Sequence, residues 1–191
     1  STKPFITGAF SAKGVRAIRE LLAADAGGYD ALKARPRAIL DITSLPPLKW
    51  TEVSCQNILD AGAYGLPIET ISVPLMGAAS PATLAGCVLL HTVETLSGVV
   101  LIQLVNPGNP IVYGSAPMYF DMKNMTASLN SIETNIIGAA CAQMGKYYGM
   151  PVHTYAALSD SKMNDSQAGL ETAVSAIAAS LAGIDVISGP G

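Results

Sequence analysis

Short, mostly apolar runs rich in β-branched residues alternate along the chain with longer runs of helical character. Continuous apolar runs, unlike runs that alternate with polar residues, are typical of parallel strands covered on both faces. The predicted strands are Phe5–Thr7, Ala38–Ile42, Ile68–Val73, Ile111–Tyr113, Val152–Tyr155 and Asp185–Ile187. The predicted helices are Lys13–Ala24, Thr51–Tyr64, Pro81–Val105, Ser131–Tyr148 and Ser166–Ala182. This alternation predicts an α/β fold with a parallel sheet.

The signals that end and begin helices recur at a regular spacing. Gly65, Gly108 and Gly149 each stand two residues before a proline, lie 43 and 41 residues apart, and would each end a helix just before a strand. The predicted N-caps of the last three helices are Ser80, Asn130 and Asn164, with Asp165 as the alternative to Asn164. The spacing indicates a repeated βα unit.

Two architectures fit such a repeat, a doubly wound open sheet and a TIM (β/α)8 barrel. A complete barrel needs about 250 residues, and this chain has 191. The chain stops directly after a predicted strand, which favours a truncated barrel. We therefore expect a partial TIM barrel, with about six parallel strands and five intervening helices, and residues 1–191 as a single segment of one domain. In either architecture, function belongs at the carboxyl ends of the strands.

Composition narrows the function classes. Half of the residues are hydrophobic, only 13% are charged, and the formal net charge is −3. These values exclude a disordered chain, and we expect no nucleic-acid partner. The three cysteines have no C-x-x-C spacing and the start has no signal-peptide pattern, so we expect a reducing, cytoplasmic location. Because the chain is so apolar, the composition predicts a large interface with another chain or segment. We expect a homo-oligomer in the full-length form.

The segment from Thr83 to Val105 is the one candidate for a membrane span. It contains Glu94, His91 and Gln103, which a spanning helix tolerates poorly. We expect a soluble helix that is buried on nearly all sides, and no membrane. In the isolated chain its far side should expose a contiguous apolar patch, which another subunit or further chain covers.

Several chemistries lack their motifs. The chain has no Walker A or G-x-G-x-x-G loop and no G-x-S-x-G elbow. Its two histidines, His91 and His153, are 62 residues apart, so we expect no metal site. The strand ends are mostly small and uncharged, and such a pocket suits an alkylammonium better than a phosphorylated substrate.

The candidate site residues lie at or beyond strand ends. Asp160, His153 and Lys162 are the candidate catalytic residues, and the substrate-binding candidates are the aromatic residues Tyr113, Tyr119, Phe120 and Tyr155. Each has a structural alternative. Lys162 would be solvated, His153 would pack outward beneath a helix, and the aromatic residues would belong to the core instead of a cage for a cation. Glu69 and Gln103 are predicted to be structural.

Six segments resemble the trimethylamine:corrinoid methyltransferase family. They are Lys3–Phe5, Pro46–Trp50, Pro74–Gly86, Ile111–Ser115, Lys146–Pro151 and Ser159–Glu171. The resemblance covers nearly the whole chain, and family members are several hundred residues long. It implies a TIM barrel that moves a methyl group from a methylated amine to the cob(I)alamin of a separate small corrinoid protein, with no cofactor bound directly.

The family also bears on the substrate. Archaeal trimethylamine enzymes carry pyrrolysine near the region matched by Ser159–Lys162, and this chain has only the twenty standard residues. Relatives without pyrrolysine include enzymes for quaternary amines such as glycine betaine, so a quaternary amine is preferred here. We expect the loop Ser159–Asp165 at the barrel mouth near Tyr113 and Tyr155, with Asp160 balancing the ammonium charge. A non-catalytic amine-binding module or an inactive fragment is the alternative.

Overall fold

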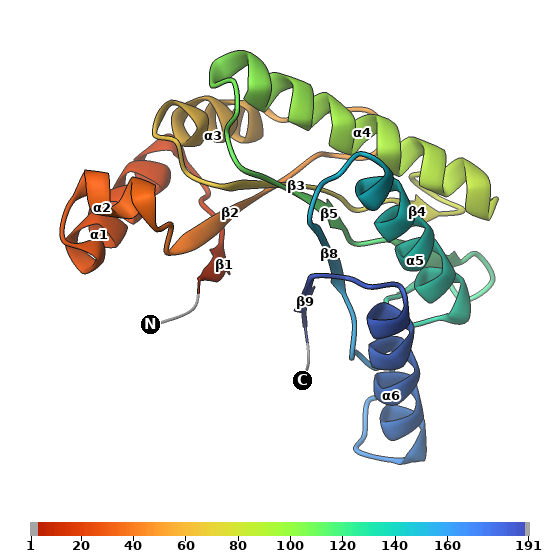
Figure 1. Ribbon diagram of the computed structural model, residues 1–191. Helices are drawn as coiled ribbons and strands as arrows, with labels where there is room; N and C mark the ends of the chain where they lie inside the picture. Colours follow the sequence, from red (N-terminus) through yellow and green to blue (C-terminus); the bar gives the residue numbers. More distant parts are fainter. Residues whose placement is uncertain (1–3, 190–191) are drawn as a thin grey trace.

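A computed structural model describes residues 4–189 and shows one strongly curled sheet lined by helices. The strands of this sheet are β1 (Phe5–Thr7), β2 (Ala38–Thr43), β3 (Ile68–Ser72), β5 (Ile111–Ser115), β8 (Val152–Tyr155) and β9 (Val186–Ser188). The helices are α1 (Ala12–Ala26), α2 (Tyr29–Ala34), α3 (Glu52–Ala63), α4 (Leu84–Val105), α5 (Ile132–Tyr147) and α6 (Ser166–Leu181). Figure 1 shows the helices along the convex side of the sheet, and the concave side open between the two ends of the chain.

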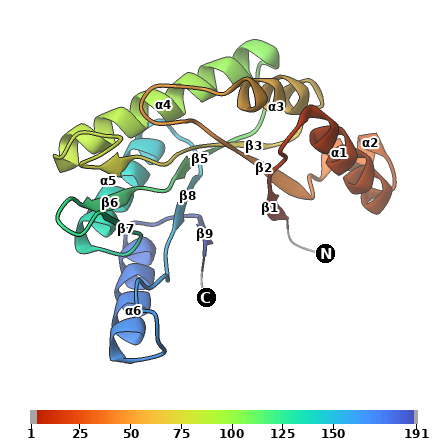
Figure 2. The same cartoon turned by 180° about the vertical axis from the view of Figure 1, so that it is seen from behind.

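The sheet has the topology of a partial barrel. Its strand order is β1-β2-β3-β5-β8-β9, which follows the chain, and each neighbouring pair is parallel. A doubly wound sheet would reverse its order and carry helices on both faces. The view from behind in Figure 2 again shows helices on one side only. The partial α/β barrel predicted from the sequence is therefore confirmed.

A second, small sheet and a short helix are additions that the sequence did not reveal. The small sheet contains β4 (Leu75–Met76), β6 (Met118–Asp121) and β7 (Thr126–Ser128), and β6 pairs with both others. Because β4 and β6 come directly after β3 and β5, this sheet lies at the carboxyl ends of the barrel strands. Strands of two to four residues are too short to show a hydrophobic period.

The main core lies between the sheet and the helices. Leu40 and Ile42 of β2 and Ile68 of β3 pack in one cluster with Ile58 of α3 and Ile102 of α4. Side chains of a strand alternate between its two faces. The residues between these apolar positions therefore face the concave side of the sheet, and two of them are carboxylates.

Side-chain caps start five helices, and two of the caps differ from the predicted residues. Thr83, Ser131 and Asp165 accept hydrogen bonds from the backbone N–H groups three residues further on. Ser80 and Asn130 were predicted in place of Thr83 and Ser131, and Asp165 is the one of the two predicted alternatives, Asn164 and Asp165, that caps α6. Adjacent Ser, Thr, Asn and Asp residues are near-equal N-caps, so the sequence locates the helix start without choosing the residue.

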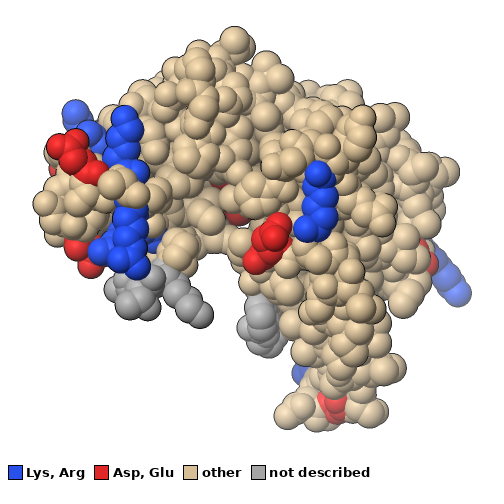
Figure 3. All heavy atoms as spheres, viewed as in Figure 1, with Lys and Arg blue, Asp and Glu red and all other residues tan. Residues whose placement is uncertain are grey.

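Helix α4 has a buried polar inner side and an apolar outer side. The buried carboxylate of Glu94 accepts hydrogen bonds from the hydroxyls of Ser44 and Ser72, which ties the helix to the ends of β2 and β3. Leu89, Val100 and Leu104 are exposed on the outer side of the helix. In Figure 3 the surface over this helix carries no lysine, arginine, aspartate or glutamate. Exposed apolar residues thus lie on the outer side of α4, as predicted, but only 33% of its most apolar stretch is buried within the described chain. Burial on nearly all sides and cover by another subunit stay predictions.

By length and composition alone, α4 is also a helix able to cross a membrane, with a mean hydropathy of 1.8. Its inner side is that of a core helix, because His91 and Glu94 are buried there and bonded to the sheet.

Two glycines offer a matched test of the helix–sheet packing. A Cβ at Gly145 of α5 would collide with Val152 and lie 2.9 Å from the Tyr113 ring, whereas nothing lies within 4 Å of a Cβ at Gly169 of α6. Gly145→Ala should therefore lower the free energy of unfolding by about 1–3 kcal/mol. Gly169→Ala should raise it by about 0.5–1 kcal/mol because alanine is the better helix former. Urea denaturation of the two variants checks both signs, and equal effects would contradict the tight packing at Gly145.

Candidate active site on the concave face

A buried acidic cluster lies on the concave face of the half-barrel. Asp41 of β2 and Glu69 of β3 are register partners on neighbouring strands. His153 of β8 turns the same way, and its Nδ1 contacts Glu69 Oε1 in a fully buried pair. Glu69 extends over β5, where Gly114 provides the space, since a Cβ at this position would occupy the place of the carboxylate. The cluster therefore joins three strands across a gap that glycine leaves open.

The cluster has spare hydrogen-bonding capacity. Asp41 Oδ1, Glu69 Oε2 and His153 Nε2 are each buried without a hydrogen-bond partner among the described residues. An unpaired buried polar atom costs about 1–3 kcal/mol, and native proteins keep few of them. Three such atoms on one face mark a place where a further polar or charged group belongs.

The charge of the cluster is negative. Burial and the neighbouring Glu69 charge raise the pKa of Asp41 to about 6, and His153 opposes this rise. Among residues 4–189, neither Asp41 nor Glu69 forms an ion pair with a lysine or arginine. Figure 3 shows a deep notch on this side of the molecule with acidic atoms at its roof. A negative, partly desolvated face of this kind attracts a cation.

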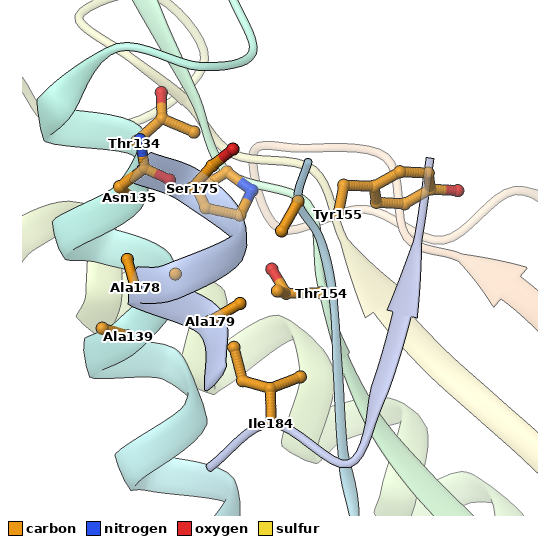
Figure 4. Close-up of a pocket in the computed structure, with 12 residues that line it drawn as sticks. Thr134, Asn135, Ala139, Thr154, Tyr155, Ser175, Ala178, Ala179 and Ile184 are labelled. Atoms are coloured by element: carbon orange, nitrogen blue, oxygen red, sulfur yellow. The ribbon is translucent and has the colours of Figure 1, made fainter. Parts of the chain in front are cut away.

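Tyr155 supplies an aromatic ring beside the cluster. Its ring meets that of His153 edge-on, with centroids 5.4 Å apart, and 38% of the residue is exposed. Figure 4 shows the ring pointing away from the small hollow between α5 and α6. Burial and the charges of Asp41 and Glu69 raise the pKa of the Tyr155 hydroxyl. His153 and Tyr155 thus both lie on the concave face. Of the two orientations that the sequence left open for His153, the structure has the inward one.

The prediction that Tyr113 lies at the barrel mouth with Tyr155 is wrong. Tyr113 is buried on the convex side, where its hydroxyl lies 3.3 Å from His91 Nδ1 and donates to Thr92 Oγ1 of α4. Its ring belongs to the core with Val152 and Ala142. Strand β5 turns Gly114, not Tyr113, toward the concave face, so the ring cannot meet a ligand there.

Asp160 is held by the connection between β7 and α5. It accepts hydrogen bonds from the Ser128 hydroxyl and from the backbone N–H groups of Leu129 and Asn130. Its backbone N–H donates to Glu171 of α6. With these donors satisfying the carboxylate, the geometry favours a structural role for Asp160 over the predicted contact with an ammonium group.

The other three sequence candidates, which are Lys162, Tyr119 and Phe120, lie away from the cluster. Lys162 is exposed in the loop before α6, and Asp165 caps that helix. Tyr119 packs against the buried group of Met76, Cys87, Ile137 and Cys141, and Phe120 is half-buried on the small sheet. The contacts found for these residues connect loops and helices and do not reach Asp41, Glu69 or His153.

Sequence reasoning missed the two carboxylates of the cluster. Asp41 was one of several charged residues near strand ends, and Glu69 was predicted to be structural. The available signal was a single carboxylate inside each apolar strand, AILDIT and IETIS. A lone charge in a strand that is covered on both sides is costly unless it is paired or used.

Among the described residues, no set of three potential ligands is grouped to hold a metal ion.

The parallel strands in chain order and the helices on one side define a segment of a (β/α)-barrel protein with an acidic cluster on its inner face. Residues 1–189 match the family model described as trimethylamine methyltransferase (MTTB), and the chain belongs to this family. It is 38% identical to trimethylamine methyltransferase MttB of Methanosarcina thermophila, over 86% of this chain and 34% of the relative. It is 34% identical to the MttB protein of Desulfitobacterium hafniense, over 100% of this chain and 38% of the relative.

A glycine betaine methyltransferase of Desulfitobacterium hafniense is also similar, with 35% identity over 84% of this chain and 34% of that protein. The chain therefore spans about a third of the length of the curated relatives it matches. The resemblance found in the sequence is confirmed, and the family contains proteins named for two different methylated amines.

Proposed function

We propose that this chain forms the amine-binding side of a methyltransferase that moves a methyl group from a tertiary or quaternary amine to the cob(I)alamin of a separate corrinoid protein. Family membership supports the reaction class. The observation that carries the site is the pair of concave-face carboxylates, Asp41 and Glu69, without a lysine or arginine partner in the described chain. A methylated ammonium is a cation of complementary charge.

The residues of this chain act by holding and desolvating the amine. Asp41 and Glu69 balance the ammonium charge, and Tyr155 offers a ring face to N-methyl groups. The corrinoid supplies the nucleophilic electron pair when its partner protein delivers it, and we assign no residue of this chain to its binding. The carbon–nitrogen bond breaks, and the bonding pair leaves with nitrogen as a neutral amine. A quaternary ammonium needs no proton transfer to leave this way, so we propose it as the preferred substrate.

The test uses the full-length protein with its corrinoid protein in the cob(I)alamin state. Loss of the cob(I)alamin absorption should occur on addition of a quaternary amine, and more slowly with trimethylamine. Release of the demethylated amine in equal amount should accompany it. Tight binding of amines without methyl transfer would show a binding module instead, and neither binding nor transfer would refute the proposal.

A further inference from the structure

A hollow of about 570 Å³ opens at the carboxyl ends of β1 and β2, beside the acidic cluster. One wall is the loop after β1, which includes Phe10, and the opposite wall is the first turns of α3, which include Asn57. Asp41, Ile42 and Thr43 of β2 also line it. Asp41 is thus common to the lining of this hollow and to the acidic cluster with Glu69 and His153.

Two residues that line the hollow each have a buried side-chain oxygen without a hydrogen-bond partner in the described chain, and both oxygens are acceptors. Asn57 is 3% exposed, and its Nδ2 donates to the backbone oxygen of Ala9 at 2.7 Å. This bond fixes the amide so that Oδ1 is the unpartnered atom, and Oδ1 is buried. Asp41 Oδ1 is the second such atom. Two acceptors without donors suit a ligand that carries positive charge or polarised hydrogen atoms.

The positive end of α3 does not reverse this preference. Its first-turn N–H of Ser54 is already bonded to the Thr51 side chain, and Glu52 lies in the first turn. An acidic residue there compensates the helix dipole. The field in the hollow is therefore set by Asp41 with Glu69 behind it, and His153 offsets part of it.

Phe10 is the apolar element of the hollow. It is 99% exposed, so its ring stands in solvent at the rim without neighbours to cover it. An aromatic face next to a carboxylate is the combination that binds alkylammonium groups, because the ring attracts the cation and also covers its methyl groups. The same residues would bind a phosphate or carboxylate group poorly.

We propose that this hollow is the subsite for the ammonium head of the ligand, with Asp41 as its counter-ion and the Phe10 ring closing over its N-methyl groups. Asn57 Oδ1 accepts the polarised C–H or N–H groups of the head. The inference rests on the proposed function and assigns the ammonium contact to Asp41 and Phe10 in place of Asp160 and Tyr113.

The experiment measures binding to the full-length protein by calorimetry. The probes are choline and its uncharged carbon isostere 3,3-dimethylbutan-1-ol, which has the same shape. Asp41→Asn should raise the Kd of choline at least about tenfold and leave that of the isostere nearly unchanged, because only choline carries the charge. Phe10→Ala should raise the Kd of choline about fivefold, and Phe10→Trp should restore it.

Controls separate this subsite from others. Tyr147→Ala removes a similarly exposed ring at the end of α5 and should leave binding unchanged. Asp160→Asn tests the competing carboxylate and should change the Kd less than twofold. If Asp41→Asn does not fold, the Phe10 variants decide, since Phe10 makes no core contact. If Phe10→Ala and Asp41→Asn each change the Kd of choline by less than twofold, the proposed subsite is wrong. The proposed function is not affected by that result. Absence of binding of any methylated amine to the unmodified protein refutes both.

Discussion

Replacing Glu69 by Gln should lower kcat/KM for methyl transfer at least about thirtyfold in the full-length protein. Glu69 is fully buried and contacts His153, and removing one partner of a buried charge pair costs on the order of 2–5 kcal/mol. The substitution leaves the shape of the side chain almost unchanged, so the loss reports the charge. Stopped-flow measurement of cob(I)alamin loss with the preferred amine gives the rate.

A positioning role has a signature that a packing role lacks. The Glu69 charge raises the pKa of Asp41, so Glu69→Gln should shift the acid limb of the pH–rate profile to lower pH. Glu133→Gln, in the first turn of α5, removes a carboxylate outside the cluster and should change neither rate nor profile. An unaltered rate for Glu69→Gln would exclude the concave cluster from the reaction.

The free energy of unfolding should depend on pH in a way that reflects the titration of Asp41. Because the folded-state pKa of Asp41 is raised to about 6 from 3.8, the folded state binds this proton more tightly than the unfolded state. Its contribution to stability is therefore present below about pH 4 and is lost as the pH rises through 6. The shift corresponds to at most about 3 kcal/mol.

The comparison with Asp41→Asn isolates this effect from other titrating groups. Urea denaturation from pH 4 to 7.5 should show the unfolding free energy of the unmodified protein falling relative to that of the variant across this range. Near neutral pH the variant should be the more stable protein and the less active one, as expected where a binding site keeps an unpaired buried charge. A constant difference between the two proteins at all pH values would contradict the raised pKa.

The six barrel strands and five of the helices were predictable because their signals are local. Apolar runs mark strands, and Gly–x–Pro segments and capping residues mark the helix limits. The observed strands start or end within about two residues of the predicted ones, as β2 and β9 illustrate. The order of the strands followed from the βα repeat, since a right-handed crossover places each parallel strand beside the previous one.

The side of the sheet that a residue faces was not determined by these runs. A strand that is apolar on both faces has no alternation from which to read its phase, and the sequence therefore placed Tyr113 and Tyr155 together. The packing of the helices determines which face each ring occupies. Tyr113 is enclosed by α4 and α5 against Val152, and Tyr155 lies on the opposite face beside His153.

The sequence by itself determined the partial barrel and the family, and it predicted a weakly charged site at the strand ends, whereas the acidic cluster lies within β2, β3 and β8. Only the tertiary structure decided which charges form the site, because Glu69 and His153 are 84 residues apart and meet across β5. That meeting depends on Gly114, whose missing side chain leaves room for the carboxylate. Curvature of the sheet and the space above one glycine are properties of packed strands, and no local pattern in the chain encodes them.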